Sequence, residues 1–380
     1  GAPASAVRRA LDEVAERTRR RTGTMPELPG VELLGERAAI AGLQRNGPWS
    51  CGGAYRALPT ANGWWGLSLP RADDLALVPA LVGRSSLGDA WSTVARWARE
   101  RPTDEVVSRA HMLGLACAAI PLGPGPPQRA PVTTVAGGTR SHRRERPLVV
   151  DLTALWAGPL CAHLIGLGGA DVIKVETPHR PDGARNGAAA FFDLLHAGHL
   201  MLALDLREES DVRALRTLIS RADLVLEASR PRALRQAGLN ATEIVADGTS
   251  WLSITARGRS EDVIGFGDDV AAGAGLVVVD RDGVLPCGDA LADPLTGVVA
   301  ASAAAAVLLE KRAHLVDVSM HHVATAAAAS GVPEPHLVER RGDAWWVQCD
   351  AGEVPVSDPV ARASRGPAGK LGADTRAVLG

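Results

Sequence analysis

Short strand-like segments and helix-like segments alternate from residue 147 to residue 320, and this alternation limits the possible folds more than any other feature of the chain. Such an order with short connections requires parallel pairing, because each helix carries the chain back across the sheet before the next strand begins. The sequence therefore predicts an α/β domain with a doubly wound parallel sheet. The strand-like segments lie at 147–153 (PLVVDLT), 171–176 (DVIKVE), 200–206 (LMLALDL), 223–229 (DLVLEAS), 251–255 (WLSIT) and 314–320 (HLVDVSM).

The first 120 residues have a different texture and predict a smaller α+β region. Apolar positions at helical spacing over 5–22 predict an exposed amphipathic helix. Glycine turns and tryptophans over 51–70 predict strands of a hairpin, and residues 74–120 favour two or three helices. One stripe of these helices is typical of a core and holds Trp91, Val94 and Trp97.

Residues 121–146 are rich in proline and arginine and contain a diglycine, which predicts a linker between two domains. We accordingly expect a large domain over 147–333. A C-terminal segment over 334–380 contains a second tryptophan-rich strand, and no repeat of fixed period is visible in the chain.

The composition indicates a globular protein and excludes several classes of partner. Hydrophobic residues make up 46% of the 380 residues, charged residues 22%, and the formal charge of −2 gives no basic field for nucleic acid. Five scattered cysteines form no CxxC pair, which argues against a disulfide framework or a zinc site. With no signal-peptide pattern and no long apolar run, we expect a soluble, cytoplasmic protein that does not enter a membrane.

Ligands of a parallel sheet bind outside the carboxyl ends of its strands, so the loops that follow the strands are candidate site segments. The first of these loops, at 153–159 (TALWAGP), lacks the glycine triplet of dinucleotide-binding proteins, which argues against NAD. No GxSxG elbow supports a serine hydrolase, and the doublet His321-His322 has no HExxH pattern. We expect no metal and no permanently bound cofactor.

The segment 288–297 (GDALADPLTG) places two carboxylates ahead of an alanine-rich helix. Pro294 suits the first turn of that helix, which predicts Asp293 as its N-cap. An N-cap carboxylate is held ionised by the helix dipole and its donors, so the same residue is also able to act as a nucleophile. For Asp289 the sequence favours an exposed turn residue.

Six blocks of the chain, in the correct order, resemble the family III CoA-transferases, the CaiB/BaiF group that includes formyl-CoA transferase and α-methylacyl-CoA racemase. The resemblance covers residues 147 to about 330. Its blocks are 149–176 (VVDLTALWAGPLCAHLIGLGGADVIKVE), 202–206 (LALDL), 222–239 (ADLVLEASRPRALRQAGL), 251–258 (WLSITARG), 288–297 (GDALADPLTG) and 312–320 (RAHLVDVSM).

The resemblance implies that Asp293 is the catalytic nucleophile, when the blocks are aligned on Thr296 and Gly297. It implies an acyl-CoA:carboxylate CoA-transferase that works through an aspartyl anhydride and an aspartyl-CoA thioester, with acyl-CoA and a carboxylic acid as substrates and an interlaced homodimer as the assembly. Gly52 and Gly53 would correspond to the glycine-rich loop of the substrate site. The implied CoA contacts are Leu155, Trp156, Ala157, His199, Ala228, Ser229, Arg230 and Thr255.

Two departures from the family pattern leave alternatives open. Racemase-type members have a histidine where this chain has Asp268, and the segment that resembles the family's small domain precedes the large-domain blocks, as in a permuted chain. The alternatives to a transferase are an acyl-CoA racemase or isomerase that uses Asp293 as a base, and a catalytically silent CoA-binding protein.

Overall fold

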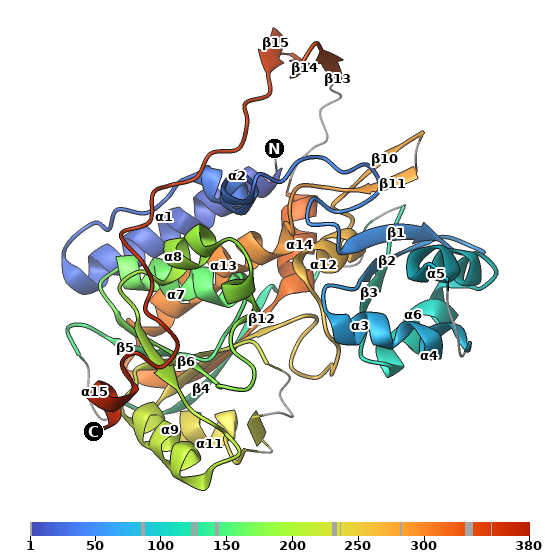
Figure 1. Ribbon diagram of the computed structural model, residues 1–380. Helices are drawn as coiled ribbons and strands as arrows, with labels where there is room; N and C mark the ends of the chain where they lie inside the picture. The colour runs from blue at the N-terminus through green and yellow to red at the C-terminus, as the bar shows by residue number, and fades with distance from the viewer. Residues whose placement is uncertain are drawn as a thin grey trace.

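The computed structural model describes residues 2–84, 88–122, 125, 128–140, 144–229, 234–235, 237–281, 283–330, 337–350 and 352–380. Figure 1 shows a large body built around one sheet and a smaller lobe beside it, with the C-terminal strands set apart from both.

One seven-stranded sheet forms the centre of the large body, in the order β4-β12-β9-β8-β5-β6-β7. Every neighbouring pair in it is parallel except β12 with β4, which is antiparallel. The chain first winds from β5 outward to β7 and then from β8 outward to β12, so the predicted doubly wound α/β sheet is confirmed. The strands are β4 (Val132–Thr139), β5 (Leu148–Asp151), β6 (Asp171–Glu176), β7 (Leu200–Ala203), β8 (Leu224–Glu227), β9 (Ser250–Thr255) and β12 (Arg312–Ser319).

Helices cover both faces of this sheet, because its central strands are apolar on both sides. Side chains such as Val149 and Leu226 face one core, whereas Val150 and Val225 face the other. The first face is covered by α1 (Ala2–Thr22), α7 (Ala157–Leu167), α8 (Ala189–His196), α13 (Ala292–Val307) and α14 (Met320–Ala329). The second is covered by α9 (Glu209–Arg221), α11 (Ala241–Ala246) and α15 (Thr375–Leu379).

Helix α1 belongs to the large body rather than to the small lobe. Its apolar stripe, including Val7, Leu11 and Val14, is buried in the core of the first face, and Arg17 donates a 2.7 Å hydrogen bond to the carbonyl of Ser302 on α13. The helix predicted over 5–22 is therefore present, but one of its faces is buried rather than exposed.

The linker predicted over 121–146 is wrong for residues 132–139, which form the edge strand β4. Gly137 and Gly138, taken as loop residues in the sequence, lie where the strand closely approaches α11. A Cβ on Gly137 would lie 2.5 Å from the carbonyl oxygen of Val245, and one on Gly138 would lie 2.0 Å from that of Ala246. Glycine is needed here for close packing and not for a turn.

The small lobe has a three-stranded antiparallel sheet, β1-β2-β3, covered by short helices. Its core contains Trp65, Val94 and Trp97, which confirms that the predicted tryptophan stripe is a core feature. The elements are β1 (Tyr55–Pro59), β2 (Trp64–Ser68), β3 (Ala116–Ala119), α3 (Ala72–Ala76), α4 (Val78–Val82), α5 (Ala90–Arg99) and α6 (Thr103–Met112).

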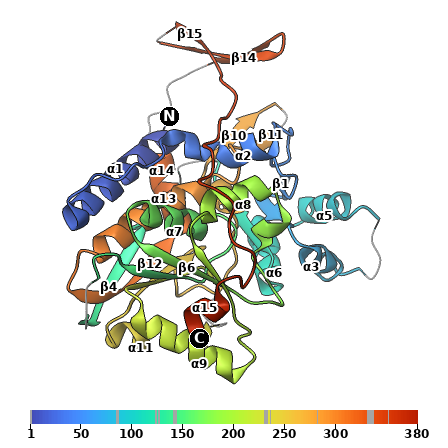
Figure 2. The same cartoon turned by 60° about the vertical axis from the view of Figure 1, so that its left-hand side comes forward.

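Three groups of short elements connect these parts. The hairpin β10 (Val277–Asp280) and β11 (Gly283–Pro286) follows α12 (Gly267–Gly273), which packs between the small lobe and α13. Helix α2 (Glu36–Ala41), after the 3-10 turn η1 (Val31–Leu34), lies against α8 of the large body, as Figure 2 shows. A separate sheet is formed by β13 (Leu337–Arg341), β14 (Ala344–Cys349) and β15 (Gly352–Pro355).

The C-terminal tail returns across the large body and ends beside the sheet (Figure 1). The Asp374 carboxylate accepts a 2.8 Å hydrogen bond from the Met201 backbone of the edge strand β7. No helix in the part of the chain that the structure describes is long and apolar enough to span a membrane.

Candidate functional site

Asp293 is the second residue of α13, which begins at Ala292 after Leu291. The prediction that Asp293 is the N-cap is therefore wrong by two residues, although Pro294 does lie in the first turn. The side chain is partly exposed, and within the described ranges no donor hydrogen-bonds to its carboxylate. A carboxylate that is not used as a cap is available to an incoming group.

The carboxylate of Asp293 lies against the first residue of α12. A Cβ on Gly267 would be 2.5 Å from Asp293 Oδ2 and 2.3 Å from the Ala290 carbonyl oxygen, so glycine is required for this approach. The approach brings the next two residues of α12, Asp268 and Asp269, into the electrostatic environment of Asp293.

Asp289 is buried, with 4% of its surface exposed, and does not lie in an open turn as predicted from the sequence. Its carboxylate accepts two hydrogen bonds from Arg37 of α2, one of them from Nε at 2.9 Å and the other from Nη2. This fork compensates the burial of the charge. The expectation of an exposed residue is wrong because the partner lies 252 residues earlier in the chain.

The four carboxylates and Arg37 set the protonation of the site. The pKa of Asp293 is raised to about 7, chiefly by burial and also by Asp268, Asp269 and Asp289, while Arg37 opposes the increase. Burial also raises the pKa of Asp268 to about 6 and that of Asp269 to about 7. Asp293 therefore exchanges its proton close to neutral pH, as a group with an acid–base or nucleophilic role requires.

Asp268, which the resemblance aligns with the histidine of racemase-type members, has a clear local partner. Its Oδ1 accepts a 3.0 Å hydrogen bond from the backbone N–H of Ala290, a residue with the unusual φ of 44°. Asp268 thus holds the strained turn that leads into α13.

Leu155 and Trp156 form the turn before α7, at the carboxyl end of the central strand β5. Leu155 has a φ of 72° and 42% of its surface exposed, and its backbone N–H donates to Asp182 Oδ1 at 2.9 Å. Thr153 is held at the same place, because Asp151 accepts its N–H at 2.9 Å and Lys174 donates to its carbonyl at 2.9 Å.

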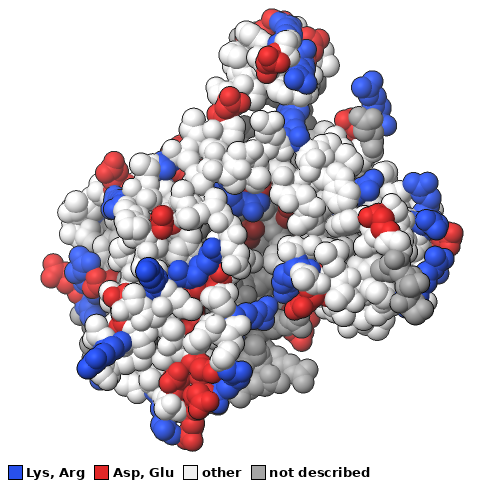
Figure 3. All heavy atoms as spheres, in the orientation of Figure 1, with Lys and Arg blue, Asp and Glu red and all other residues white. Residues whose placement is uncertain are grey.

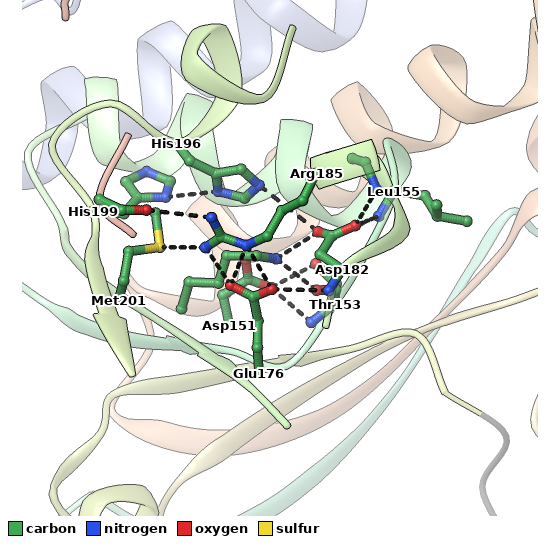
Figure 4. A network of polar contacts seen from close by, with 12 residues as sticks. Asp151, Thr153, Leu155, Glu176, Asp182, Arg185, His196, His199 and Met201 are labelled. Atoms are coloured by element: carbon green, nitrogen blue, oxygen red, sulfur yellow. Dashed lines mark hydrogen bonds and ion pairs between the residues drawn. The ribbon is translucent and has the colours of Figure 1, made fainter. Parts of the chain in front are cut away.

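A buried network of charges lies beneath this turn (Figure 4). Lys174 is completely buried, with its Nζ 2.9 Å from Asp182 and 3.9 Å from Asp151. Next to it, Arg185 binds Glu176, with Nη2 at 2.6 Å from Oε2. These pairs keep the loop at 177–187 packed under the turn, so the geometry of Leu155 is fixed before any ligand arrives.

His199 belongs to this buried network and not to the open surface. Its Nδ1 is 3.3 Å from Nδ1 of His196, and its Nε2 would lie 3.4 Å from a Cβ on Gly166. Burial, together with the charge of Lys174, lowers the pKa of His199 to about 4. This placement gives no support to the direct CoA contact predicted for His199.

Trp156 and Ala157 connect the turn to the carboxylates. Ala157 is the first residue of α7, and its carbonyl oxygen would lie 2.8 Å from a Cβ on Gly297, so α7 and α13 pack closely at their first turns. Trp156 is buried, and the Arg37 guanidinium lies 5.1 Å from the centre of its ring. The two helix starts therefore share one site.

The other predicted CoA contacts lie at the same edge of the sheet. Ala228 is exposed after β8, and Ser229 donates to the buried Glu227 at 2.9 Å. Thr255 ends β9 and donates to Asp317 at 2.8 Å. Arg230, predicted to contact a phosphate, lies outside the residues that the structure describes.

A basic groove of about 380 Å³ lies next to Thr255. Arg257 and Arg129 line it, and neither has an ion-pair partner within the described parts of the chain. Arg259 also lines it and lies 3.9 Å from Glu227. Two carboxylates, Glu261 and Asp317, line the groove as well, so its three guanidinium groups leave an excess of one positive charge, which favours a phosphate-bearing ligand. A larger cavity of about 590 Å³, between α1, α13 and α14, contains none of the four carboxylates.

The loop with Gly52 and Gly53 reaches the carboxylate cluster from the small lobe. Cys51 Sγ lies 3.5 Å from the carbonyl of Gly288, and a Cβ on Gly52 would lie 4.0 Å from Arg37 Nη2. Gly53 has a φ of 75°, which glycine adopts without strain. Figure 3 shows charged side chains of both signs in the depression between the large body and the small lobe.

Three site residues were not identified from the sequence. Arg37 lies in a segment where nothing marks it, Lys174 lies within the strand predicted at 171–176, and Asp182 lies in the loop after that strand. Of the three, Lys174 is the one that the sequence could have indicated, because a lysine in an otherwise apolar strand requires a buried partner of opposite charge. No group of His, Cys, Asp and Glu in the described ranges has the arrangement of a metal site.

Comparison with known proteins identifies the family. The sequence pattern of CoA-transferase family III matches residues 147–342, more than half of the chain, so this protein belongs to that family. The succinyl-CoA–D-citramalate CoA-transferase of Chloroflexus aurantiacus is 29% identical over 230 residues, 53% of this chain and 57% of that protein. The succinyl-CoA:glutarate CoA-transferase of Mus musculus is 30% identical over 179 residues, 43% of this chain and 41% of that protein.

The chain spans about half the length of these curated relatives. Among solved structures, a hypothetical protein of Mycobacterium tuberculosis is 27% identical, with a TM-score of 0.49 over 56% of this chain and 65% of that one. A CaiB/BaiF family protein of Brucella suis is 22% identical, with a TM-score of 0.46 over 57% of this chain and 66% of that one.

Proposed function

We propose that this protein transfers CoA between an acyl-CoA thioester and a carboxylic acid, with Asp293 as the nucleophile. The observation that carries the proposal is the state of Asp293: a partly exposed carboxylate, without a hydrogen-bond donor in the described chain, at the start of a helix. Its pKa of about 7 leaves a substantial ionised fraction at neutral pH. The family to which the chain belongs supports the same chemistry.

The proposed reaction divides one exchange into four displacements. The Asp293 carboxylate attacks the thioester carbonyl and releases CoA thiolate, which leaves a mixed anhydride. The thiolate attacks the aspartyl carbon and releases the donor acid, which leaves an aspartyl-CoA thioester. The acceptor carboxylate then displaces the thiolate to form a second anhydride. Attack of the thiolate on the acceptor acyl carbon gives the new acyl-CoA and restores Asp293.

The groove beside Thr255 is the proposed site for the phosphates of CoA. The ends of β9 and β5 are separated only by β8, so they lie on the order of 10 Å apart. An extended ligand with its phosphates at Arg257 would then pass the Leu155 turn on its way to Asp293. The relatives named above act on succinyl-CoA with citramalate or glutarate, so small dicarboxylic acids are the first acceptors to test.

Hydroxylamine trapping tests the nucleophile. Full-length protein incubated with an acyl-CoA and hydroxylamine is expected to carry a hydroxamate on Asp293, detected by peptide mass spectrometry. Asp293→Ala should abolish the adduct and lower transfer by at least about 10³-fold, because it removes the covalent step. The exposed Asp343→Ala is the matched control and should behave as wild type.

The remaining outcomes distinguish the alternatives. Deuterium incorporation at the acyl α-carbon without transfer would indicate a racemase or isomerase, and CoA binding without either would indicate a silent binding protein. An Asp293→Asn variant with full transferase activity would contradict the assignment of the nucleophile.

Arg257→Gln tests the position of CoA. We expect KM for acyl-CoA to rise about 10-fold with little change in kcat, since a phosphate contact contributes equally to the ground state and the transition state. Arg96→Gln, on an exposed position of α5, is the matched control. An unchanged KM for Arg257→Gln would place the phosphates elsewhere.

A further inference from the structure

Arg37 joins the carboxylate site from a distant part of the chain. It lies on α2, outside the segment 147–342 that matches the family. Its guanidinium uses Nε and Nη2 to bind Asp289, lies over the ring of Trp156, and has 31% of its side chain exposed. Within the described chain Nη1 has no hydrogen-bond acceptor, so one side of the group faces the site.

The helix that carries Arg37 is anchored independently of the carboxylates. Glu36, with 2% of its surface exposed, accepts a 3.0 Å hydrogen bond from Arg362 Nη2 in the C-terminal tail. Arg362 Nη1 also lies 3.0 Å from His163 Nε2 on α7. Glu36 therefore links α2 to α7 through Arg362, so the helix has an attachment that does not involve Arg37.

The charges around Asp293 are unbalanced without Arg37. Several ionisable groups surround Asp293 and its carboxylate neighbours. They are Arg37 from α2, Asp268 and Asp269 from α12, Asp289 from the turn before α13, and Cys51 and Tyr55 from the small lobe, which face the neighbouring carboxylates.

We infer that Arg37 is the positioning residue of the Asp293 site: it fixes Asp289 and supplies the positive charge that keeps Asp293 ionised among three other carboxylates. The inference rests on the proposed role of Asp293. Its geometric basis is the fork on Asp289, the stacking on Trp156 and the separate anchor at Glu36. The effects on the pKa of Asp293 agree with it, because Arg37 lowers that pKa whereas Asp268, Asp269 and Asp289 raise it.

A double-mutant cycle that neutralises Arg37 and Asp289 tests the inference in the full-length protein. Arg37→Gln should raise the pKa of Asp293 by about one unit, because it removes the opposing charge. Asp289→Asn should lower that pKa by a similar amount, and the double variant should return it close to the wild-type value. The pKa is followed by ¹³C NMR of the aspartate carboxyl carbons without substrate, with Asp293→Asn used to assign the signal.

The pH dependence of CoA transfer provides the second readout. The acid limb of kcat/KM should move to higher pH in Arg37→Gln, so that activity at pH 6 falls about 5-fold more than activity at pH 8. Arg37→Lys, which keeps the charge without the fork, should restore the position of the limb but not the full rate.

Two results would overturn the inference. Unchanged titration of Asp293 in Arg37→Gln would show that Arg37 only attaches α2. A double variant that is no closer to wild type than the single variants would show that Arg37 and Asp289 do not act through charge. Because the NMR titration needs no turnover, a protein that failed to transfer CoA would refute the proposed function and still give a result for Arg37.

Discussion

Two helices that pack against each other, α7 and α13, each begin after a strained turn. Leu155 with a φ of 72° precedes α7, and Ala290 with a φ of 44° precedes α13; among the residues that the structure describes, no other non-glycine residue has a positive φ. In each turn the backbone N–H donates to a carboxylate from another element, Asp182 at 2.9 Å and Asp268 at 3.0 Å. The two turns therefore share one backbone arrangement, a residue with positive φ whose N–H is bound by a carboxylate.

The two turns differ in the charge around the carboxylate that holds them. Asp182 has the buried Lys174 at 2.9 Å as its counter-ion (Figure 4). Asp268 lies among three further aspartates with Arg37 as the opposing cation, and its pKa is raised to about 6. The comparison shows one strained geometry in two electrostatic settings, the first with paired charges and the second with excess carboxylates around the aspartate that we propose as the nucleophile.

The largest expected effect comes from removing the counter-ion of the paired turn. Lys174→Met should lower the free energy of unfolding by about 3–5 kcal/mol, because it leaves Asp151 and Asp182 buried without compensation. Urea denaturation measures the loss. The exposed Lys311→Met serves as the control and should change stability by less than about 0.5 kcal/mol. A small loss for Lys174→Met would mean that the two turns do not differ in charge pairing.

The next largest difference between the two turns is expected when Asp182 and Asp268, which accept their backbone N–H groups, are each replaced by asparagine. Each asparagine keeps an oxygen to accept the backbone N–H. Asp182→Asn should cost about 3 kcal/mol because Lys174 loses its nearer partner. Asp268→Asn should be neutral or stabilising by about 1 kcal/mol at pH 7.5, because it removes a charge that its neighbours repel. An equal loss of unfolding free energy in the two variants, measured by urea denaturation, would contradict the difference in charge pairing between the turns.

The carboxylate-rich turn should also make stability depend on pH. The pKa values of Asp268, Asp269 and Asp293 are raised to about 6, 7 and 7. Unfolded aspartate has a pKa of about 3.9, so the folded state binds more protons between about pH 4 and pH 7. The contribution of these groups to stability is therefore largest at low pH and is lost as pH rises through their folded pKa values.

Asp269→Asn measures one part of this dependence. The variant should gain stability relative to wild type as pH rises from about 4 to 7, by about 1–3 kcal/mol in urea denaturation. Its asparagine keeps an acceptor for Ser68 and for the Phe266 N–H. A difference from wild type that does not change with pH would show that Asp269 is already ionised at low pH.

The smallest effects are expected from relieving the backbone strain itself. Leu155→Gly and Ala290→Gly should each change stability by less than about 1 kcal/mol, because the relief of left-handed strain is offset by the greater freedom of glycine in the unfolded chain. Their kinetic effects should differ: Leu155→Gly raises KM for acyl-CoA, whereas Ala290→Gly lowers kcat. The same kinetic effect in both variants would mean that the turns do not have separate roles.

The sequence predicted the sheet and its winding because each strand is a local apolar segment whose period shows without its neighbours. It did not predict β4, where Gly137 and Gly138 have the pattern of a turn but are needed for contact with α11. Asp293 was proposed as the nucleophile because it lies in a contiguous motif. The partner of Asp289 was not found, because an ion pair across 252 residues leaves no local pattern.

The docking of α1 on α13 has a consequence for synthesis of the protein. Arg17 and Ser302 are 285 residues apart, so a ribosome that adds about 5–20 residues per second makes α1 roughly 15–60 s before its partner. During that interval the apolar stripe of Val7, Leu11 and Val14 has no helix to cover it. The apolar stripe of α1 thus stays uncovered until α13 has been made, and a permuted gene starting near residue 147 would shorten the delay.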